Sequence, residues 1–163
     1  MRLPHVELRA PSLLIASLAL QVAIRLLPAG GRFPALLAAN VLVGYWLLVN
    51  LRERVVPVAL AFSLVSIGWG MNLIAISLNG GMPVSIEAVQ RVGATAGQLD
   101  EAVLLKHTPA DQGLLDQWLG DVIPVPPVDM VVSLGDIVMG AGLATLMGLG
   151  LVLRSEPQLS ASP

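Results

Sequence analysis

Four apolar stretches alternate with short polar breaks along the chain. They cover about residues 12–27, 34–51, 57–78 and 133–153. The second and third hold no charged residue, and the 22 residues of the third would reach about 33 Å as a helix, enough to cross a bilayer. The first is broken by Gln21 and Arg25, and the fourth holds Asp136 near its start. This pattern predicts an all-α integral membrane protein, a four-helix transmembrane bundle forming one membrane domain over residues 1–163.

The segment from 79 to 131 differs from the rest in charge. It holds seven acidic residues against two basic ones, so we expect it outside the bilayer. Asn79-Gly80-Gly81-Met82-Pro83 predicts a sharp end to the third helix. Ser85 predicts the N-cap of a short helix, and the prolines of 123–127 predict extended chain. We expect loops and short helices that lie against the bilayer surface and are ordered by contact with the bundle.

Composition narrows the class of protein. Of the 163 residues 55% are hydrophobic and 12% are charged, and the net charge is −2. A soluble domain needs about twice that share of charge, and a nucleic-acid binder needs a basic patch. The chain has no cysteine, which excludes disulfides and thiolate metal sites. We expect no cofactor and no metal, and we interpret His107 as a solvated loop histidine.

Basic residues near the ends of the apolar stretches predict the orientation. Five arginines would share one side with both termini, namely Arg2, Arg9, Arg52, Arg54 and Arg154. This count favours both termini in the cytoplasm and segment 79–131 outside the cytoplasmic membrane. The first stretch also resembles a cleavable signal peptide, which would leave three spans. We expect the tail from 155 to 163 to be disordered.

Three motifs resemble a known family. They are Asn79-Gly80-Gly81-Met82-Pro83-Val84-Ser85, Leu119-Gly120-Asp121-Val122-Ile123-Pro124-Val125-Pro126 and Ser133-Leu134-Gly135-Asp136. With Gln21 they resemble an uncharacterised family of bacterial multi-pass membrane proteins, the domain of unknown function DUF 5317, over about residues 6–153. The resemblance implies a membrane location, structural roles for the motif residues and no known activity. Family members usually begin with an additional apolar segment, and this chain begins after it.

A weaker similarity concerns lipoprotein signal peptidases, which are four-span aspartyl proteases. The run Ser133 to Gly140 is similar to their last motif, in which a catalytic aspartate begins the final helix. The run Gly70-Met71-Asn72-Leu73-Ile74 lacks the aspartate and arginine of their other motif.

Asp121 and Asp136 are the candidate catalytic residues, because two close carboxylates can share a proton and activate water. The structural interpretation is at least as direct. Ser133 and Asp136 have the spacing of a capping box, and an acid suits the first turn of a helix. Asp121 would then hold backbone N–H groups in a turn.

Polar and small residues inside the apolar stretches have two interpretations each. Gln21, Asn40 and Asn72 could line a polar path, or they could form hydrogen bonds between helices. Gly140, Ala144 and Gly148 recur every four residues and predict close packing of the fourth helix against the third, or against a second copy.

The sequence therefore leaves three functions open. The leading one is an accessory or interaction protein acting through its outer segment, with the lipid bilayer, a membrane protein or a second copy as partner and no nucleic acid. The alternative is an intramembrane hydrolase using Asp121 and Asp136, which requires the two carboxylates to converge. The second alternative is a small transporter or channel subunit, which requires Asn40 and Asn72 to face one cavity.

Overall fold

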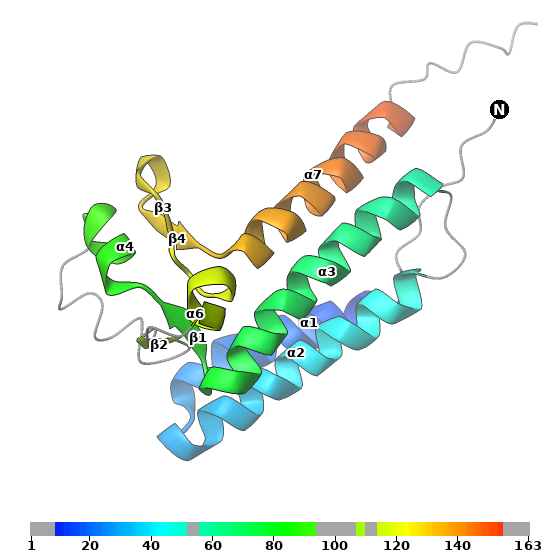
Figure 1. The fold of residues 1–163 in the computed structure, drawn as a ribbon. Coiled ribbons are helices and arrows are strands. Elements are labelled where there is room, and N and C mark those ends of the chain that lie inside the picture. Colours follow the sequence, from blue (N-terminus) through cyan, green and yellow to red (C-terminus); the bar gives the residue numbers. More distant parts are fainter. Residues whose placement is uncertain (1–8, 52–55, 94–106, 110–113, 155–163) are drawn as a thin grey trace, which may run out of the picture.

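The computed structural model describes residues 9–51, 56–93, 107–109 and 114–154. Four longer helices dominate: α1 (Pro11–Ala23), continued by the 3-10 turn η1 (Ile24–Leu26), α2 (Ala29–Leu51), α3 (Val56–Asn79) and α7 (Leu134–Arg154). Between α3 and α7 lie β1 (Met82–Val84), α4 (Ile86–Arg91), β2 (His107–Pro109), α6 (Leu114–Leu119), β3 (Ile123–Val125), η2 (Pro126–Val128) and β4 (Met130–Val132). We call the described residues from 80 to 132 the head (Figure 1).

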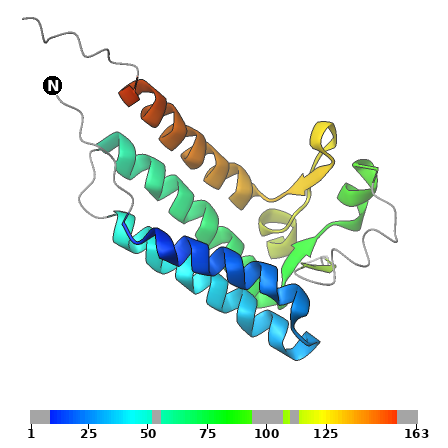
Figure 2. The same cartoon turned by 180° about the vertical axis from the view of Figure 1, so that it is seen from behind.

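The long helices are arranged as a row rather than a closed bundle. The main contacts run from α7 to α3, from α3 to α2 and from α2 to α1. The start of α1 lies beside the end of α2, where Asn50 Oδ1 accepts a hydrogen bond from the backbone N–H of Arg9 at 2.8 Å. The end of α7 lies at this same end of the row, and the head lies at the opposite end (Figures 1 and 2).

Two of these helices, α2 with 23 residues and α3 with 24, are long and apolar enough to cross a membrane. The apolar stretches of Pro11–Leu26 and Leu134–Leu149 are shorter, so the four-span bundle is not confirmed. The second apolar stretch, 34–51, lies within a longer helix, since the residues Pro28-Ala29-Gly30-Gly31, whose composition predicts a turn, already enter α2 at Ala29. Pro34 is the sixth residue of α2, just past the first turn, and it removes one backbone hydrogen bond of the helix.

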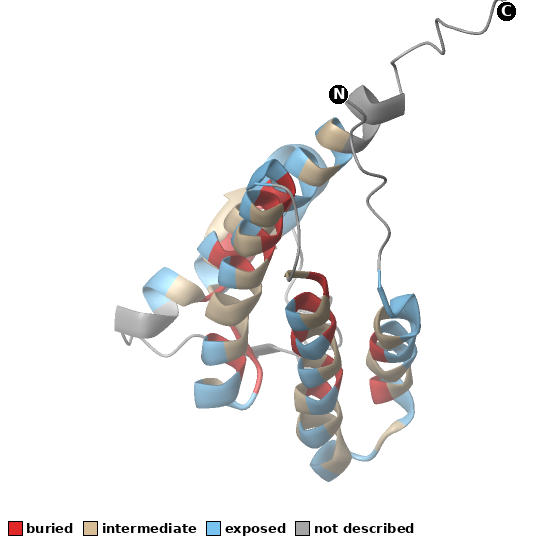
Figure 3. Cartoon of the chain, turned by 90° about the vertical axis from the view of Figure 1, so that its right-hand side faces the viewer, coloured by how far each residue is buried: buried red, intermediate tan, exposed pale blue. Residues whose placement is uncertain are grey.

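The inner faces of the helices form two apolar clusters. One lies next to the head and contains Ile24, Leu36, Ala75, Ile76 and Met82. The other lies toward the far end and contains Trp46, Leu47, Val58, Phe62 and Val65. The burial map in Figure 3 shows buried residues on the inner helix faces and exposed ones on the outer faces.

The outer faces of the helices are apolar as well. Side chains that are 47–70% exposed occur on all four long helices: Ile15, Leu18, Val41, Leu48, Leu60, Ile67, Ile74, Leu143 and Met147. Large apolar side chains exposed on every long helix indicate a surface that another molecule or lipid would cover.

The head contains short strand pairs that the sequence does not predict. β1 pairs with β2 in parallel, and β3 pairs with β4 antiparallel. The chain leaves α3 through Gly80, whose φ of +71° is a conformation that glycine adopts without strain. Met82 then packs against Ile24 and Ile76, which anchors the head on the ends of the helices.

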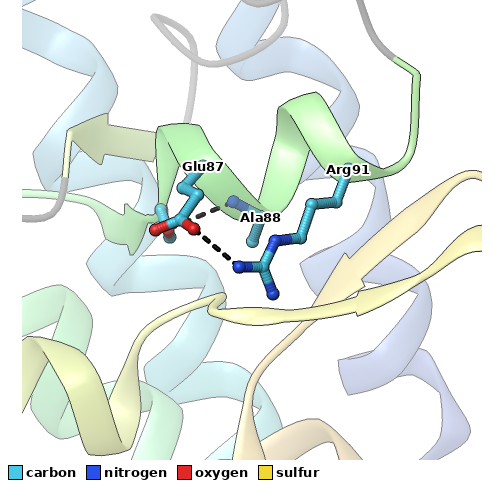
Figure 4. A network of polar contacts seen from close by, with 4 residues as sticks. Glu87, Ala88 and Arg91 are labelled. Atoms are coloured by element: carbon cyan, nitrogen blue, oxygen red, sulfur yellow. Dashed lines mark hydrogen bonds and ion pairs between the residues drawn. The ribbon is translucent and has the colours of Figure 1, made fainter.

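Ser85 caps α4 as predicted, because its side chain accepts a hydrogen bond from the backbone N–H of Ala88 at 3.2 Å. Glu87 and Arg91 on the same helix form an ion pair at 2.6 Å (Figure 4). Both side chains are well exposed, so this pair contributes little to stability.

Candidate ligand-binding cavity

A cavity of about 350 Å³ lies among the long helices and the head. Its lining consists of Gln21, Leu36, Asn40, Val43, Trp69, Asn72, Ile76, Met82, Asp121, Asp136 and Met139. Each of the four long helices provides one polar side chain to this lining, and the head provides a fifth. The two groups of polar residues that the sequence singles out separately, the carboxylates and the amides, therefore belong to one site.

Helix periodicity explains how α2 and α3 contribute. Leu36, Asn40 and Val43 are spaced by four and three residues, so they lie on one face of α2. Residues 69, 72 and 76 form the matching stripe on α3. Because α1 packs on α2 and α7 packs on α3, Gln21 and Asp136 reach the cavity from its two sides.

Asp136 is held in place by a closed set of hydrogen bonds. Asn72 Nδ2 donates to Asp136 Oδ1 at 2.7 Å, and the backbone N–H of Ser133 donates to Asp136 Oδ2 at 3.0 Å. The hydroxyl of Ser133 accepts from the backbone N–H of Asp136 and donates to Asn72 Oδ1, both at 3.0 Å. The capping box of α7 is present, with an aspartate in the usual glutamate position, and Asn72 joins it to α3.

Glycines allow α3 and α7 to approach closely enough for this network. A Cβ at Gly135 would collide with Asn72 Oδ1 and would lie 2.8 Å from the carbonyl oxygen of Gly68. A Cβ at Gly142 would lie 2.7 Å from the carbonyl oxygen of Ala61. The structural role expected for Gly135 thus has a physical basis.

The predicted helix-packing glycines do not take part in this contact. A Cβ at Gly140 or Gly148 would have no neighbour within 4 Å, and Ala144 is exposed. Gly135 and Gly142 lie at the interface instead, because the packed face of α7 is the one that continues from its capping box. The expected packing of Gly140, Ala144 and Gly148 on the third helix is therefore wrong.

Asp121 is positioned by its backbone. Its N–H donates to the carbonyl of Pro83 at 2.8 Å, and its carbonyl accepts from the N–H of Ser85 at 2.9 Å. These bonds join the second motif to the first, beside the buried Gly81, Met82 and Gly120. Asp121 is buried, with only 7% of its surface exposed, and it lines the cavity.

The remaining amides form bonds within their own helices. Asn40 Nδ2 donates to the carbonyl of Leu36 at 2.9 Å, and Asn79 Nδ2 donates to the carbonyl of Ala75 at 2.9 Å. Gln21 Nε2 donates to Ser17 Oγ at 3.4 Å within α1, and Asn72 joins α3 to α7 through Asp136. Pro124 lies in β3, away from the cavity lining.

Some predictions from the sequence concern residues or side chains that the structure does not describe. The arginines at 52 and 54 and the tail from 155 to 163 lie outside the described residues, and only the backbone of His107 is described, in β2. Among the residues that the structure describes, no group of three or more His, Cys, Asp or Glu could hold a metal ion.

These features define a mostly helical protein with two helices of membrane-spanning length and a polar cavity between helices and head. The chain matches a family of unknown function, DUF5317, over residues 5–148, and it belongs to that family. No curated protein and no solved structure matches it. Each motif behind the resemblance provides one lining residue, namely Met82, Asp121 and Asp136.

Proposed function

We propose that the protein is a multi-pass membrane protein that binds a small polar solute in this cavity, as a transporter or channel subunit does. The observation that supports it is the convergence of five polar side chains from four helices and the head on one cavity. Burying a polar side chain among apolar helices costs free energy that hydrogen bonds or a bound ligand must offset. A cluster of such side chains around one cavity therefore indicates a binding site.

The membrane setting rests on the helices themselves. The lengths of α2 and α3 and the apolar outer faces of all four long helices suit a lipid environment. The N-terminal end of α1 and the C-terminal end of α7 lie at the same end of the row. This agrees with both termini on one side of a bacterial cytoplasmic membrane. Charge near the helix ends favours the cytoplasm for that side.

The cavity also ranks the three functions that the sequence leaves open. An accessory protein needs only a closed bundle with paired polar groups, which does not account for a cavity of about 350 Å³. A hydrolase needs two carboxylates that share a proton and activate water, whereas the bonds of Asp136 to Asn72 and Ser133 are those of a helix cap. Asn40 and Asn72 do line one cavity, which is the arrangement that a transporter requires.

The test uses single cysteines, because the chain has none of its own. Val43→Cys places a thiol in the cavity lining without changing any of the five polar side chains. Val41→Cys is the matched control, since Val41 lies two residues away on the outer face of α2 and is 62% exposed. The full chain is reconstituted in nanodiscs of phosphatidylglycerol, so that both faces of the membrane meet the reagent.

We expect water-soluble methanethiosulfonates to label Val43→Cys and to leave Val41→Cys unlabelled, because a thiol reacts as the thiolate and hydrocarbon suppresses ionisation. Gln90→Cys on the exposed part of α4 calibrates full reactivity. A Val43→Cys variant as unreactive as the Val41→Cys variant would show that no aqueous site exists between the helices, and the proposal would be wrong.

A further inference from the structure

Resting on the proposed function, we infer that the cavity selects a small organic cation, an alkylammonium with an apolar body. Charge, size and apolar lining each exclude a different class of competing solute. Together they leave a cation that is larger than a metal ion and partly apolar.

The charge of the described lining disfavours anions. Among the residues that the structure describes, eleven line the cavity, of which two are aspartates, three are amides and none is basic. Asp136 is described with neutral hydrogen-bond donors only, the amide of Asn72 and the backbone of Ser133. Carboxylates at short range repel an anion and attract a cation, and the apolar helices around the cavity screen these charges less than bulk water does.

The size of the cavity disfavours a bare metal ion. At about 30 Å³ for each molecule of liquid water, 350 Å³ holds roughly twelve waters. A desolvated sodium or magnesium ion fills a small fraction of that space and takes six or so oxygen ligands at short distances. Each oxygen of Asp136 already accepts one hydrogen bond and has one lone pair left, whereas such an ion takes several ligands at once.

The apolar part of the lining favours an organic cation. Trp69 lies in the lining with Met82 and Met139, and the aliphatic residues of α2 and α3 complete it. An indole face attracts ammonium groups, and quaternary ammonium ions are recognised by aromatic side chains in many sites. Methionine adapts to irregular apolar shapes. The carboxylates and amides suit an ammonium group, and the aromatic, methionine and aliphatic side chains suit a hydrocarbon part of the same solute.

The inference is tested with two reagents that differ in charge. Val43→Cys is labelled with the trimethylammonium-ethyl and the sulfonatoethyl methanethiosulfonates, and the rates are normalised to those at Gln90→Cys. We expect the normalised rate of the cationic reagent to exceed that of the anionic one. Adding Asp121→Asn, or separately Asp136→Asn, should lower this ratio about tenfold or more, because each removes a charge close to the thiol.

A second arm identifies the cation. Tetraethylammonium chloride should slow the cationic labelling of Val43→Cys, while sodium chloride at equal ionic strength should slow it far less. Nanodiscs containing phosphatidylethanolamine distinguish a lipid amine from a free one: protection by this lipid assigns the site to a lipid headgroup amine, and protection by tetraethylammonium alone assigns it to a soluble one.

The possible results distinguish a failure of the cation selectivity from a failure of the proposed function, an aqueous binding cavity. Labelling without preference for the cation, or a preference that neither aspartate variant changes, overturns the inference while the aqueous cavity stands. Equal protection by sodium chloride overturns the organic cation. No labelling by either reagent overturns the proposed function itself. Because the two aspartates lie on different elements, misfolding of the Asp136→Asn variant leaves the Asp121→Asn variant to decide.

Discussion

Replacing Gly135 with alanine tests the close contact between α3 and α7 that positions one side of the cavity. The new methyl group would collide with Asn72 Oδ1 and would meet the carbonyl oxygen of Gly68 at 2.8 Å. One obstacle is backbone and the other is a hydrogen-bonded amide, so neither can move away cheaply. Either α7 shifts away from α3 or the Ser133–Asn72–Asp136 network breaks.

The expected loss of stability follows from opposing terms. Overpacking of this kind costs about 1–3 kcal/mol, and a broken hydrogen bond in the network adds about 1 kcal/mol. The better helix propensity of alanine returns up to about 1 kcal/mol. We therefore expect the Gly135→Ala variant to lose about 2 kcal/mol of unfolding free energy.

Gly140→Ala is the matched control on the same helix. A Cβ there meets nothing within 4 Å, so the gain in helix propensity should stand alone and stabilise the protein by up to about 1 kcal/mol. The assay is reversible unfolding of the purified chain in mixed dodecylmaltoside and sodium dodecyl sulfate micelles, followed by circular dichroism.

A Gly135→Ala variant as stable as the native protein would refute the close contact. Equal damage from Gly140→Ala would also refute it, because α7 would then pack through the ridge of Gly140, Ala144 and Gly148 that the sequence suggests.

Other variants test the network, the start of α1 and the orientation. Ser133→Ala should cost about 1–2 kcal/mol in the same unfolding assay, whereas Ser133→Thr should cost less because it keeps the hydroxyl. Asn50→Leu removes the side chain that bonds the backbone of Arg9, so amide hydrogen exchange in the first turn of α1 should speed up while that of α7 stays unchanged. In intact bacterial cells an impermeant thiol reagent should label Gln90→Cys at once and Ser12→Cys only after permeabilisation; the reverse pattern would place the head in the cytoplasm.

Much of the local structure could be predicted from the sequence, because its determinants are local. Long charge-free stretches give α2 and α3, and the serine–aspartate spacing at 133 and 136 gives the capping box. Ser85 gives the cap of α4 in the same way. Each of these depends on residues within a few positions of one another.

The features that the sequence does not predict depend on how helices and strands are oriented and placed relative to one another. Gly140 and Gly142 are two glycines of the same helix, and only the packed structure shows that Gly142 faces α3 while Gly140 does not. The β1–β2 pair of the head joins residues more than twenty positions apart, as in the pairing of Met82 with His107. The convergence of Gln21, Asn40 and Asp121 likewise needs the relative placement of three elements that no local pattern specifies.

A tryptophan probe tests the central claim, an aqueous cavity between the helices, without changing any lining residue. Trp69 lies in the lining, while Trp46 and Trp118 do not, so replacing those two with phenylalanine leaves a single fluorophore at the site. Its emission is followed in nanodiscs while neutral acrylamide is added in water, or while brominated lipids replace part of the bilayer. We expect strong quenching by acrylamide and weak quenching by the brominated lipids. Strong quenching by the lipids with none by acrylamide would place Trp69 against hydrocarbon and contradict the account.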